Sequence, residues 1–156
     1  MTRLTILFTA FVLTLQYGYT QGFVNKSKKK VKQLLENQRD KNTVGNIQLE
    51  ETGSAIHYLV RGPGVLPGDF IYTFDTRGKC IAETATLNCD SCFQKFLQNA
   101  LARKEYRWKK LNDHAYVSTY YKKLMLEISS LDTPHSFIIR RMKWSREDYK
   151  TLLANK

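Results

Sequence analysis

The residues most able to do chemistry in this chain are three cysteines. Cys89 and Cys92 form a Cys-x-x-Cys motif, and Cys80 precedes it. At a helix N-terminus such a pair can act as a redox dithiol, because the helix dipole lowers the pKa of a thiol and the thiolate is the species that exchanges disulfides. One interpretation is a periplasmic thiol-disulfide oxidoreductase with Cys89 as nucleophile and Cys92 as resolving thiol. The other is structural: a local disulfide in an oxidising compartment, or two small buried side chains.

Spacing decides which cysteines can pair. If residues 79–87 form a strand, Cys80 lies roughly 25–30 Å from Cys89 at about 3.3 Å per residue, whereas a disulfide needs Cα atoms within about 7 Å. A Cys89–Cys92 disulfide is therefore feasible, and Cys80 is expected to be the odd cysteine. The same distance argues against a zinc site that combines the cysteines with a histidine, so we expect no metal ligands.

Other catalytic signals are missing from the sequence. It contains no Gly-x-Ser-x-Gly, no His-Glu-x-x-His and no phosphate-binding glycine loop, since Gly62-Pro63-Gly64 lacks the lysine and following helix of such a loop. Outside the redox interpretation of Cys89 and Cys92 we expect no catalytic residue, no cofactor and a non-enzymatic role.

One helix should organise the fold around the cysteine motif. Between residues 89 and 104, apolar side chains recur at helical spacing and form a single stripe, which predicts the central core helix. Asn88 or Asp90 can cap its start, and Arg103 and Lys104 place positive charge at its end. A shorter helix is predicted over 145–154, where Ser145 and Asp148 form a capping-box variant.

Short β-rich segments flank the central helix on both sides. Residues 69–74 and 79–87 are joined by the turn residues 75–78 and predict a hairpin. Further alternating or β-branched runs follow the helix between residues 106 and 142. No internal repeat is apparent. The predicted fold is α+β: one antiparallel sheet of about five to seven strands, with the central and C-terminal helices packed on one face. A third functional hypothesis, a small-ligand carrier, places a pocket between this sheet and the helix.

The first twenty residues have the pattern of a signal peptide. Arg3 precedes an uncharged apolar run over residues 4–15, which is shorter than the roughly 20 residues of a membrane span. Gly18 and Thr20 indicate cleavage before Gln21. We therefore expect a secreted or periplasmic protein with no transmembrane segment in its mature form and no intracellular nucleic acid as partner. Cleavage would lower the net charge only from +11 to +10, because residues 1–20 contain one arginine and no acid.

Residues 21–45 are expected to form a basic N-terminal helix or arm, and residues 46–156 a single α+β domain. A helix in the first segment would be capped by Ser27 and would bury the narrow stripe of Val31, Leu34 and Leu35. Asn25-Lys26-Ser27 also matches the N-glycosylation sequon, which has meaning only in a eukaryotic secretory pathway.

Basic residues interleave with aromatic residues in the second half of the chain. A sheet with one buried aromatic face and one solvated basic face would show this pattern. The leading functional hypothesis is that the basic face binds a macromolecular or anionic partner of the cell envelope: an anionic polymer, an anionic membrane surface or an acidic protein. The candidate binding residues are Arg107, Lys109, Lys122, Lys123, Arg140, Arg141 and Lys143.

Overall fold

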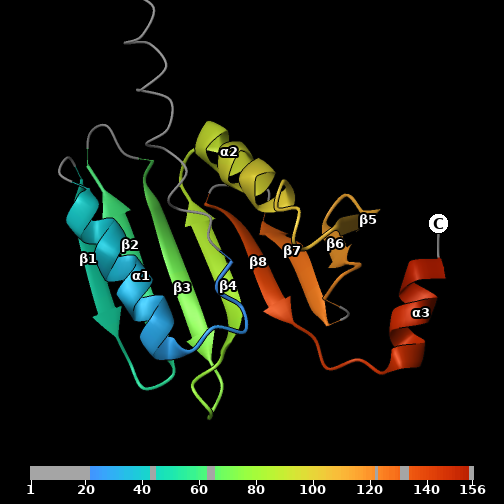
Figure 1. Ribbon diagram of the computed structural model, residues 1–156. Coiled ribbons are helices and arrows are strands. Elements are labelled where there is room, and N and C mark those ends of the chain that lie inside the picture. Colours follow the sequence, from blue (N-terminus) through green and yellow to red (C-terminus); the bar gives the residue numbers. More distant parts are fainter. Residues whose placement is uncertain (1–21, 43–44, 63–65, 122, 131–133, 155–156) are drawn as a thin grey trace, which may run out of the picture.

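The computed structural model describes residues 22–42, 45–62, 66–121, 123–130 and 134–154. The predicted signal peptide therefore lies outside the described residues. The three helices are α1 (Lys28–Lys41), α2 (Asp90–Leu101) and α3 (Arg146–Ala154) (Figure 1). The eight strands are β1 (Asn46–Glu51), β2 (Ala55–Arg61), β3 (Gly68–Phe74), β4 (Cys80–Leu87), β5 (Trp108–Asn112), β6 (Ala115–Ser118), β7 (Leu124–Ser130) and β8 (His135–Arg141).

All eight strands belong to one antiparallel sheet with the order β1-β2-β3-β4-β8-β7-β6-β5. The predicted α+β class with a single antiparallel sheet is confirmed, but the expected five to seven strands are too few. β1 and β5 are the edge strands: each pairs with one neighbour only, and neither contains a fully buried residue.

The topology repeats although the sequence does not. Each half is a helix followed by a four-stranded meander, α1 to β4 and then α2 to β8, and the last strands of both halves pair in the centre. A twofold axis between β4 and β8 would produce this strand order. The element pattern is therefore duplicated without residue-level similarity, which is why no repeat is apparent in the sequence.

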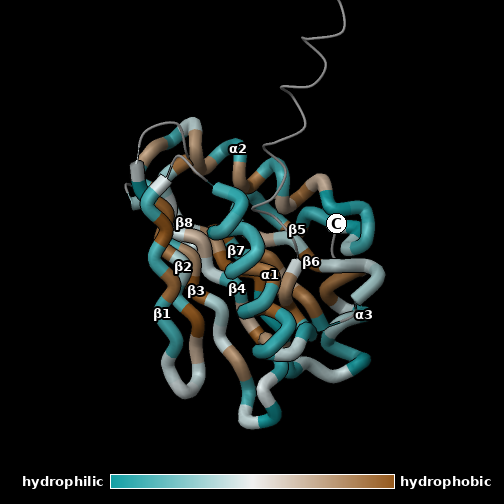
Figure 2. Tube along the Cα trace, turned by 60° about the vertical axis from the view of Figure 1, so that its left-hand side comes forward, coloured by the Kyte–Doolittle hydropathy of each residue, from teal (hydrophilic) through white to brown (hydrophobic). Residues whose placement is uncertain are grey.

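α1 and α2 cover the same face of the sheet. Their buried side chains belong to one core cluster, together with the inward-facing residues of β2, β3, β4, β7 and β8. Tyr58 of β2 and the β3 residues Phe70, Tyr72 and Phe74 supply large inward-facing aromatic side chains. Figure 2 shows the resulting distribution: α1 is largely hydrophilic, whereas hydrophobic residues concentrate in the strands.

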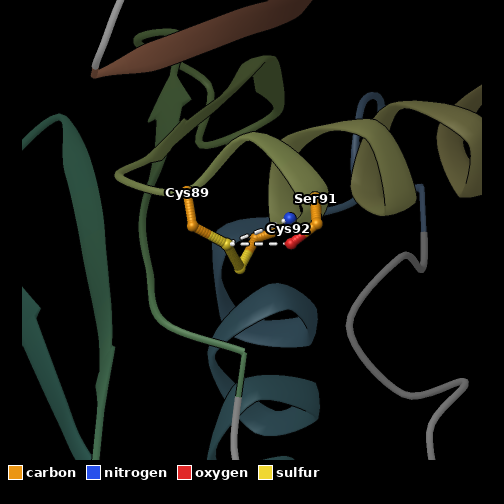
Figure 3. Close-up of a disulfide and its surroundings, with 3 residues drawn as sticks. All are labelled: Cys89, Ser91 and Cys92. Atoms are coloured by element: carbon orange, nitrogen blue, oxygen red, sulfur yellow. Dashed lines mark hydrogen bonds between the residues drawn. A yellow bond between two sulfur atoms is a disulfide. The ribbon is translucent and has the colours of Figure 1, made fainter.

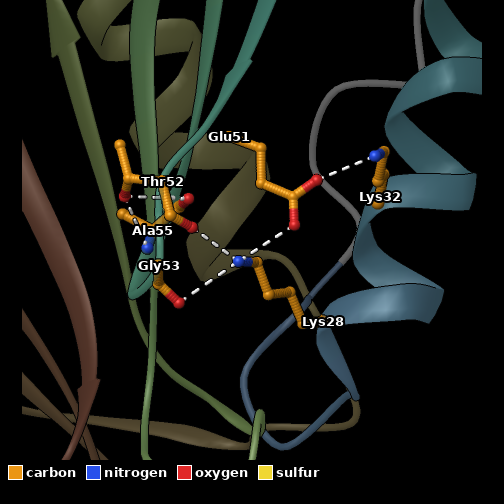
Figure 4. Close-up of polar contacts among 6 residues, drawn as sticks. All are labelled: Lys28, Lys32, Glu51, Thr52, Gly53 and Ala55. Atoms are coloured by element: carbon orange, nitrogen blue, oxygen red, sulfur yellow. Dashed lines mark hydrogen bonds and ion pairs between the residues drawn. The ribbon is translucent and has the colours of Figure 1, made fainter.

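α1 is a docked helix and not a free arm. Ser27 caps it by accepting from the backbone N–H of Lys30, and Val31 and Leu35 are fully buried against the sheet. At the rim, the Glu51 carboxylate of β1 forms ion pairs with Lys28 at 3.0 Å and Lys32 at 2.7 Å (Figure 4). These exposed pairs contribute at most about 1 kcal/mol each, so the buried stripe carries most of the docking.

α2 begins at the cysteine motif, and its cap differs from expectation. The cap is Cys89, not Asn88 or Asp90: the Cys89 Sγ accepts from the backbone N–H of Cys92 at 3.0 Å. The helix also ends at Leu101 instead of 104. As a result Arg103 leaves the helix end and points into the protein, where its side chain is only 9% exposed.

α3 covers the opposite face at the β5–β6 end of the sheet. Ala115 and Val117 are buried, although strand alternation places them on the other side from Tyr116, which packs against the main core. Tyr149 of α3 donates its hydroxyl to the Ser118 carbonyl at 2.9 Å. The apolar run of β6 is thus buried on both faces.

The expectation that the C-terminal helix shares a face with α2 is therefore wrong. Lys109 lies on the Val117 side of the sheet and donates to the Leu153 carbonyl near the C-terminal end of α3. The predicted capping box does form, because Ser145 and Asp148 exchange hydrogen bonds of 2.8 and 3.1 Å. Local capping is thus correctly predicted, whereas the face that α3 covers depends on the tertiary fold.

Candidate functional site

A surface groove lies where β7 begins and β8 ends. It has a volume of about 220 Å³ and is lined by Asn25, Tyr121, Lys123, Leu124 and Arg141. These residues come from three separate segments. The N-terminal segment reaches the groove because the backbone N–H of Asn25 donates to the Cys80 carbonyl at 2.8 Å, at the start of β4. Figure 1 shows this blue segment passing beside β4 on its way to α1.

Tyr121 forms the aromatic wall of the groove. Tyr120 and Tyr121 are 59% and 41% exposed and are the large hydrophobic side chains that the described part of the chain leaves most open. Tyr121 nevertheless has a defined orientation, since its ring packs edge-on against Tyr106 at 5.8 Å and Tyr120 at 5.0 Å. Its backbone N–H donates to the Ser118 hydroxyl at 2.8 Å. An exposed but oriented ring is suited to stacking on the face of a ligand.

The groove also carries positive charge. Lys123 is exposed, and the Arg141 guanidinium pairs with Asp75 at 2.9 Å, so part of its charge is neutralised. The pKa of Asp75 is lowered, most of all by the hydrogen bond from the Lys79 backbone N–H and also by the one from the Arg141 side chain. Burial of the Asp75 carboxylate acts in the opposite direction but is outweighed. Met142 donates its backbone N–H to the Lys123 carbonyl at 2.7 Å, which brings the exposed Lys143 next to this end of the sheet.

Of the remaining candidate binding residues, those that the structure describes do not line the groove. Arg107 precedes β5 with a φ of 48°, so it is not part of the strand that carries Lys109, and its guanidinium lies over the Tyr120 ring, 5.5 Å from the ring centroid. Lys109 caps α3. Arg140 lies on the face away from α2 and pairs with Glu127 at 2.5 Å. Lys122 lies outside the described residues.

The cysteine motif contains a disulfide. Cys89 and Cys92 are bonded with a Cα–Cα distance of 5.3 Å, and the Ser91 hydroxyl lies 3.6 Å from the Cys89 Sγ (Figure 3). Cys92 is buried, whereas Cys89 is partly exposed. All strand pairs around the motif are antiparallel, so it does not follow a parallel βαβ unit. Cys80 is a free, fully buried thiol whose pKa burial raises to about 12, which suppresses thiolate formation.

A buried carboxylate holds the N-terminal segment. Glu83 of β4 accepts from the backbone N–H groups of Phe23 and Val24 at 2.5 and 2.9 Å, and its other oxygen lies 3.8 Å from Arg103. Burial raises the pKa of Glu83, and the Arg103 charge and the two backbone donors oppose that increase. Phe23 itself is 1% exposed and packs edge-on against Tyr72. Sequence analysis did not identify Glu83 as a structural residue, because no local pattern marks a lone buried acid.

The space between the sheet and α2 is almost filled. The cavity there measures about 20 Å³, which is room for about one water molecule, and its lining includes Phe96, Arg103 and Phe137. Pockets that enclose most of a small-molecule ligand typically measure about 300–1,000 Å³. This cavity therefore gives the carrier hypothesis no support.

Among the described residues, no group of three or more His, Cys, Asp or Glu side chains could hold a metal ion. None of the helices in the described ranges is long and apolar enough to cross a membrane. Comparison with protein-family models, with curated proteins and with solved structures finds no match to this chain.

Proposed function

We propose that this protein is an exported, non-enzymatic binding protein that holds an acidic polysaccharide in the groove of Tyr121, Lys123 and Arg141. The single observation that carries the proposal is the position of an oriented, exposed aromatic ring beside basic side chains in one groove. A sugar ring can stack on Tyr121 while its carboxylate or sulfate accepts hydrogen bonds from Lys123 and Arg141.

Charge supports the same class of partner. The chain has a net charge of +11, or +10 after cleavage before Gln21, so a polyanion is attracted over long range at low ionic strength. Export rests on the apolar leader in residues 4–15.

Heparin, neutral dextran and anionic vesicles test the proposal. We expect heparin to bind and dextran not to bind. Lys123→Gln should weaken heparin binding by about tenfold, the equivalent of one charge-assisted hydrogen bond. Lys41→Gln is the matched control: it removes the same charge from an exposed site at the far end of α1, about 20 Å along the helix from Lys28.

Three results would count against this function. If Lys123→Gln and Lys41→Gln lost the same affinity for heparin, the groove would not be the binding site. Absence of heparin binding even at low salt would remove the anionic partner altogether. Binding to vesicles but not to heparin would replace the polysaccharide by a membrane surface.

A second candidate is thiol-disulfide exchange by Cys89 and Cys92. The supporting observation is that the partly exposed Cys89 lies at the start of α2, where the helix dipole stabilises a thiolate. A titration of the disulfide against glutathione buffers tests it. Reduction by the glutathione pool and turnover in an insulin-reduction assay are expected of an oxidoreductase, whereas a disulfide that resists reduction belongs to a structural role.

A further inference from the structure

Asn25 lines the groove but has no role in the proposed binding function. It is exposed and lies beside Tyr121. It also begins Asn25-Lys26-Ser27, the one Asn-x-Ser/Thr sequon in the 156-residue sequence. Sequons of this kind accept N-linked glycans when they lie on the surface of proteins in the secretory pathway.

The local backbone holds Asn25 in a defined, outward position. Its φ of 73° is left-handed, a conformation that asparagine tolerates better than most residues. Hydrogen bonds on both sides fix it against β4: Asn25 donates to the Cys80 carbonyl at 2.8 Å, and Cys80 donates to the Lys26 carbonyl at 2.9 Å. A group attached to the Asn25 amide would therefore start from a rigid point on the groove wall.

We propose that Asn25 carries an N-linked glycan whose first N-acetylglucosamine lies in the groove against Tyr121. The inference rests on the proposed export and adds a eukaryotic secretory pathway. In the transfer step, the side-chain amide nitrogen of Asn25 bonds to C1 of an oligosaccharide carried on a lipid pyrophosphate. The bond from C1 to the pyrophosphate oxygen breaks, the lipid pyrophosphate leaves, and the amide nitrogen loses one proton to a base.

This glycan would regulate the proposed binding site. Its first sugar would occupy the surface of Tyr121 on which an acidic polysaccharide stacks, and it would cover the approach to Lys123. The glycosylated protein should therefore bind heparin several-fold more weakly than the same protein without the glycan.

The first experiment asks whether Asn25 is modified. The full chain is expressed in cultured animal cells behind its own leader and, in parallel, behind a leader known to direct secretion. We expect the wild type and Ser27→Thr to run as larger species that an enzyme releasing whole N-glycans reduces in size. Asn25→Gln and Ser27→Asp should not shift. Ser27→Asp is the matched control, because aspartate keeps the cap of α1 and removes only the sequon.

The two leaders separate the two hypotheses. Retention inside the cell with the native leader alone would overturn export. An unshifted wild type delivered by the second leader would overturn glycosylation, whatever the native leader does.

The second experiment tests the position of the sugar. An endoglycosidase that leaves only the first N-acetylglucosamine gives a trimmed protein, and Ser27→Asp gives the sugar-free reference, because it keeps the asparagine that the left-handed φ of 73° at position 25 favours. We expect the trimmed protein to melt at a higher temperature and to bind heparin several-fold more weakly than this reference. Tyr121→Ala should abolish the difference in melting temperature. Equal melting temperatures and equal heparin affinities would place the sugar outside the groove and overturn that part of the inference.

Discussion

Replacing Arg103 by methionine should destabilise the protein strongly, and the loss should depend on pH. Arg103 is the charged partner of Glu83, and methionine keeps most of the apolar stem while removing the guanidinium. The side chains of Arg103 and Glu83 are 9% and 10% exposed. The variant would therefore leave a carboxylate buried without its counter-charge.

Burial sets the size of the effect. An exposed ion pair would contribute at most about 1 kcal/mol. Removal of one partner from a buried pair costs about 3–5 kcal/mol, because the remaining charge is neither solvated nor neutralised. A loss in that range is a large part of the total stability of a domain of this size. A second change, Glu83→Gln, removes the stranded carboxylate while its amide oxygen can still accept from Phe23 and Val24, so the double variant should regain much of the loss.

The pH dependence follows from the pKa of Glu83. Burial raises this pKa in the folded protein above its usual value of 4.5, and loss of Arg103 removes a charge that opposes the increase. A carboxyl with a raised folded pKa binds a proton more tightly in the folded state. The stability that this proton binding gives to the folded state is therefore fully present below about pH 4.5 and is lost as the pH rises through the folded pKa. Relative to the double variant, Arg103→Met should be least stable at neutral pH and should recover on acidification.

Urea unfolding at several pH values measures both effects. Lys104→Met is the control, because Lys104 is the exposed neighbour of Arg103, and it should change the free energy of unfolding by less than about 0.5 kcal/mol. An Arg103→Met protein as stable as the wild type at neutral pH would refute the reasoning. So would a double variant that shows no recovery.

Three more predictions concern the N-terminal segment and the cysteines. Gly22→Ala should lower the free energy of unfolding in urea by about 1–3 kcal/mol. The added Cβ would lie 1.6 Å from the Tyr106 hydroxyl, and this buried ring has little room to move. A variant as stable as the wild type would mean that the N-terminal segment does not pack against Tyr106. Thiol titration of the native protein should detect no reactive cysteine, and denaturation without reductant should release one, Cys80, because its thiol is buried and its pKa is raised to about 12; rapid native labelling would contradict its burial. Changing both Cys89 and Cys92 to serine should cost about 2 kcal/mol or less, since the closed loop is very short, and a complete loss of folding would show a larger structural role.

Local signals identified several elements correctly. The N-cap at Ser27, the stripe of Val31 and Leu35 and the capping box of α3 depend on residues within a few positions of one another. The hairpin of β3 and β4 likewise follows from alternation and a glycine turn, with Gly78 at a φ of 68°. Such features can be predicted because their partners are close in sequence.

The groove could not be predicted in the same way. The sequence marks Lys123 and Arg141 as basic and Asn25 as a sequon, but Asn25 reaches them only because the N-terminal segment binds to β4 and β8 pairs with β7. These contacts are long-range backbone hydrogen bonds, and such bonds leave no recognisable pattern in the local sequence. Lys109 and Arg140, which had the same sequence signal, lie elsewhere for the same reason.

By itself, the sequence determines the α+β class, the helical stripes, the position of the cysteine motif and the strong positive charge, because these properties depend on composition and short-range periodicity. Only the tertiary structure decides that β4 pairs with β8, that α3 covers the opposite face, that Arg103 meets Glu83 and that Asn25 joins Tyr121. The physical reason is that these contacts join segments tens of residues apart. Which segments meet depends on the packing of the whole sheet, and this packing cannot be read from any short stretch of sequence.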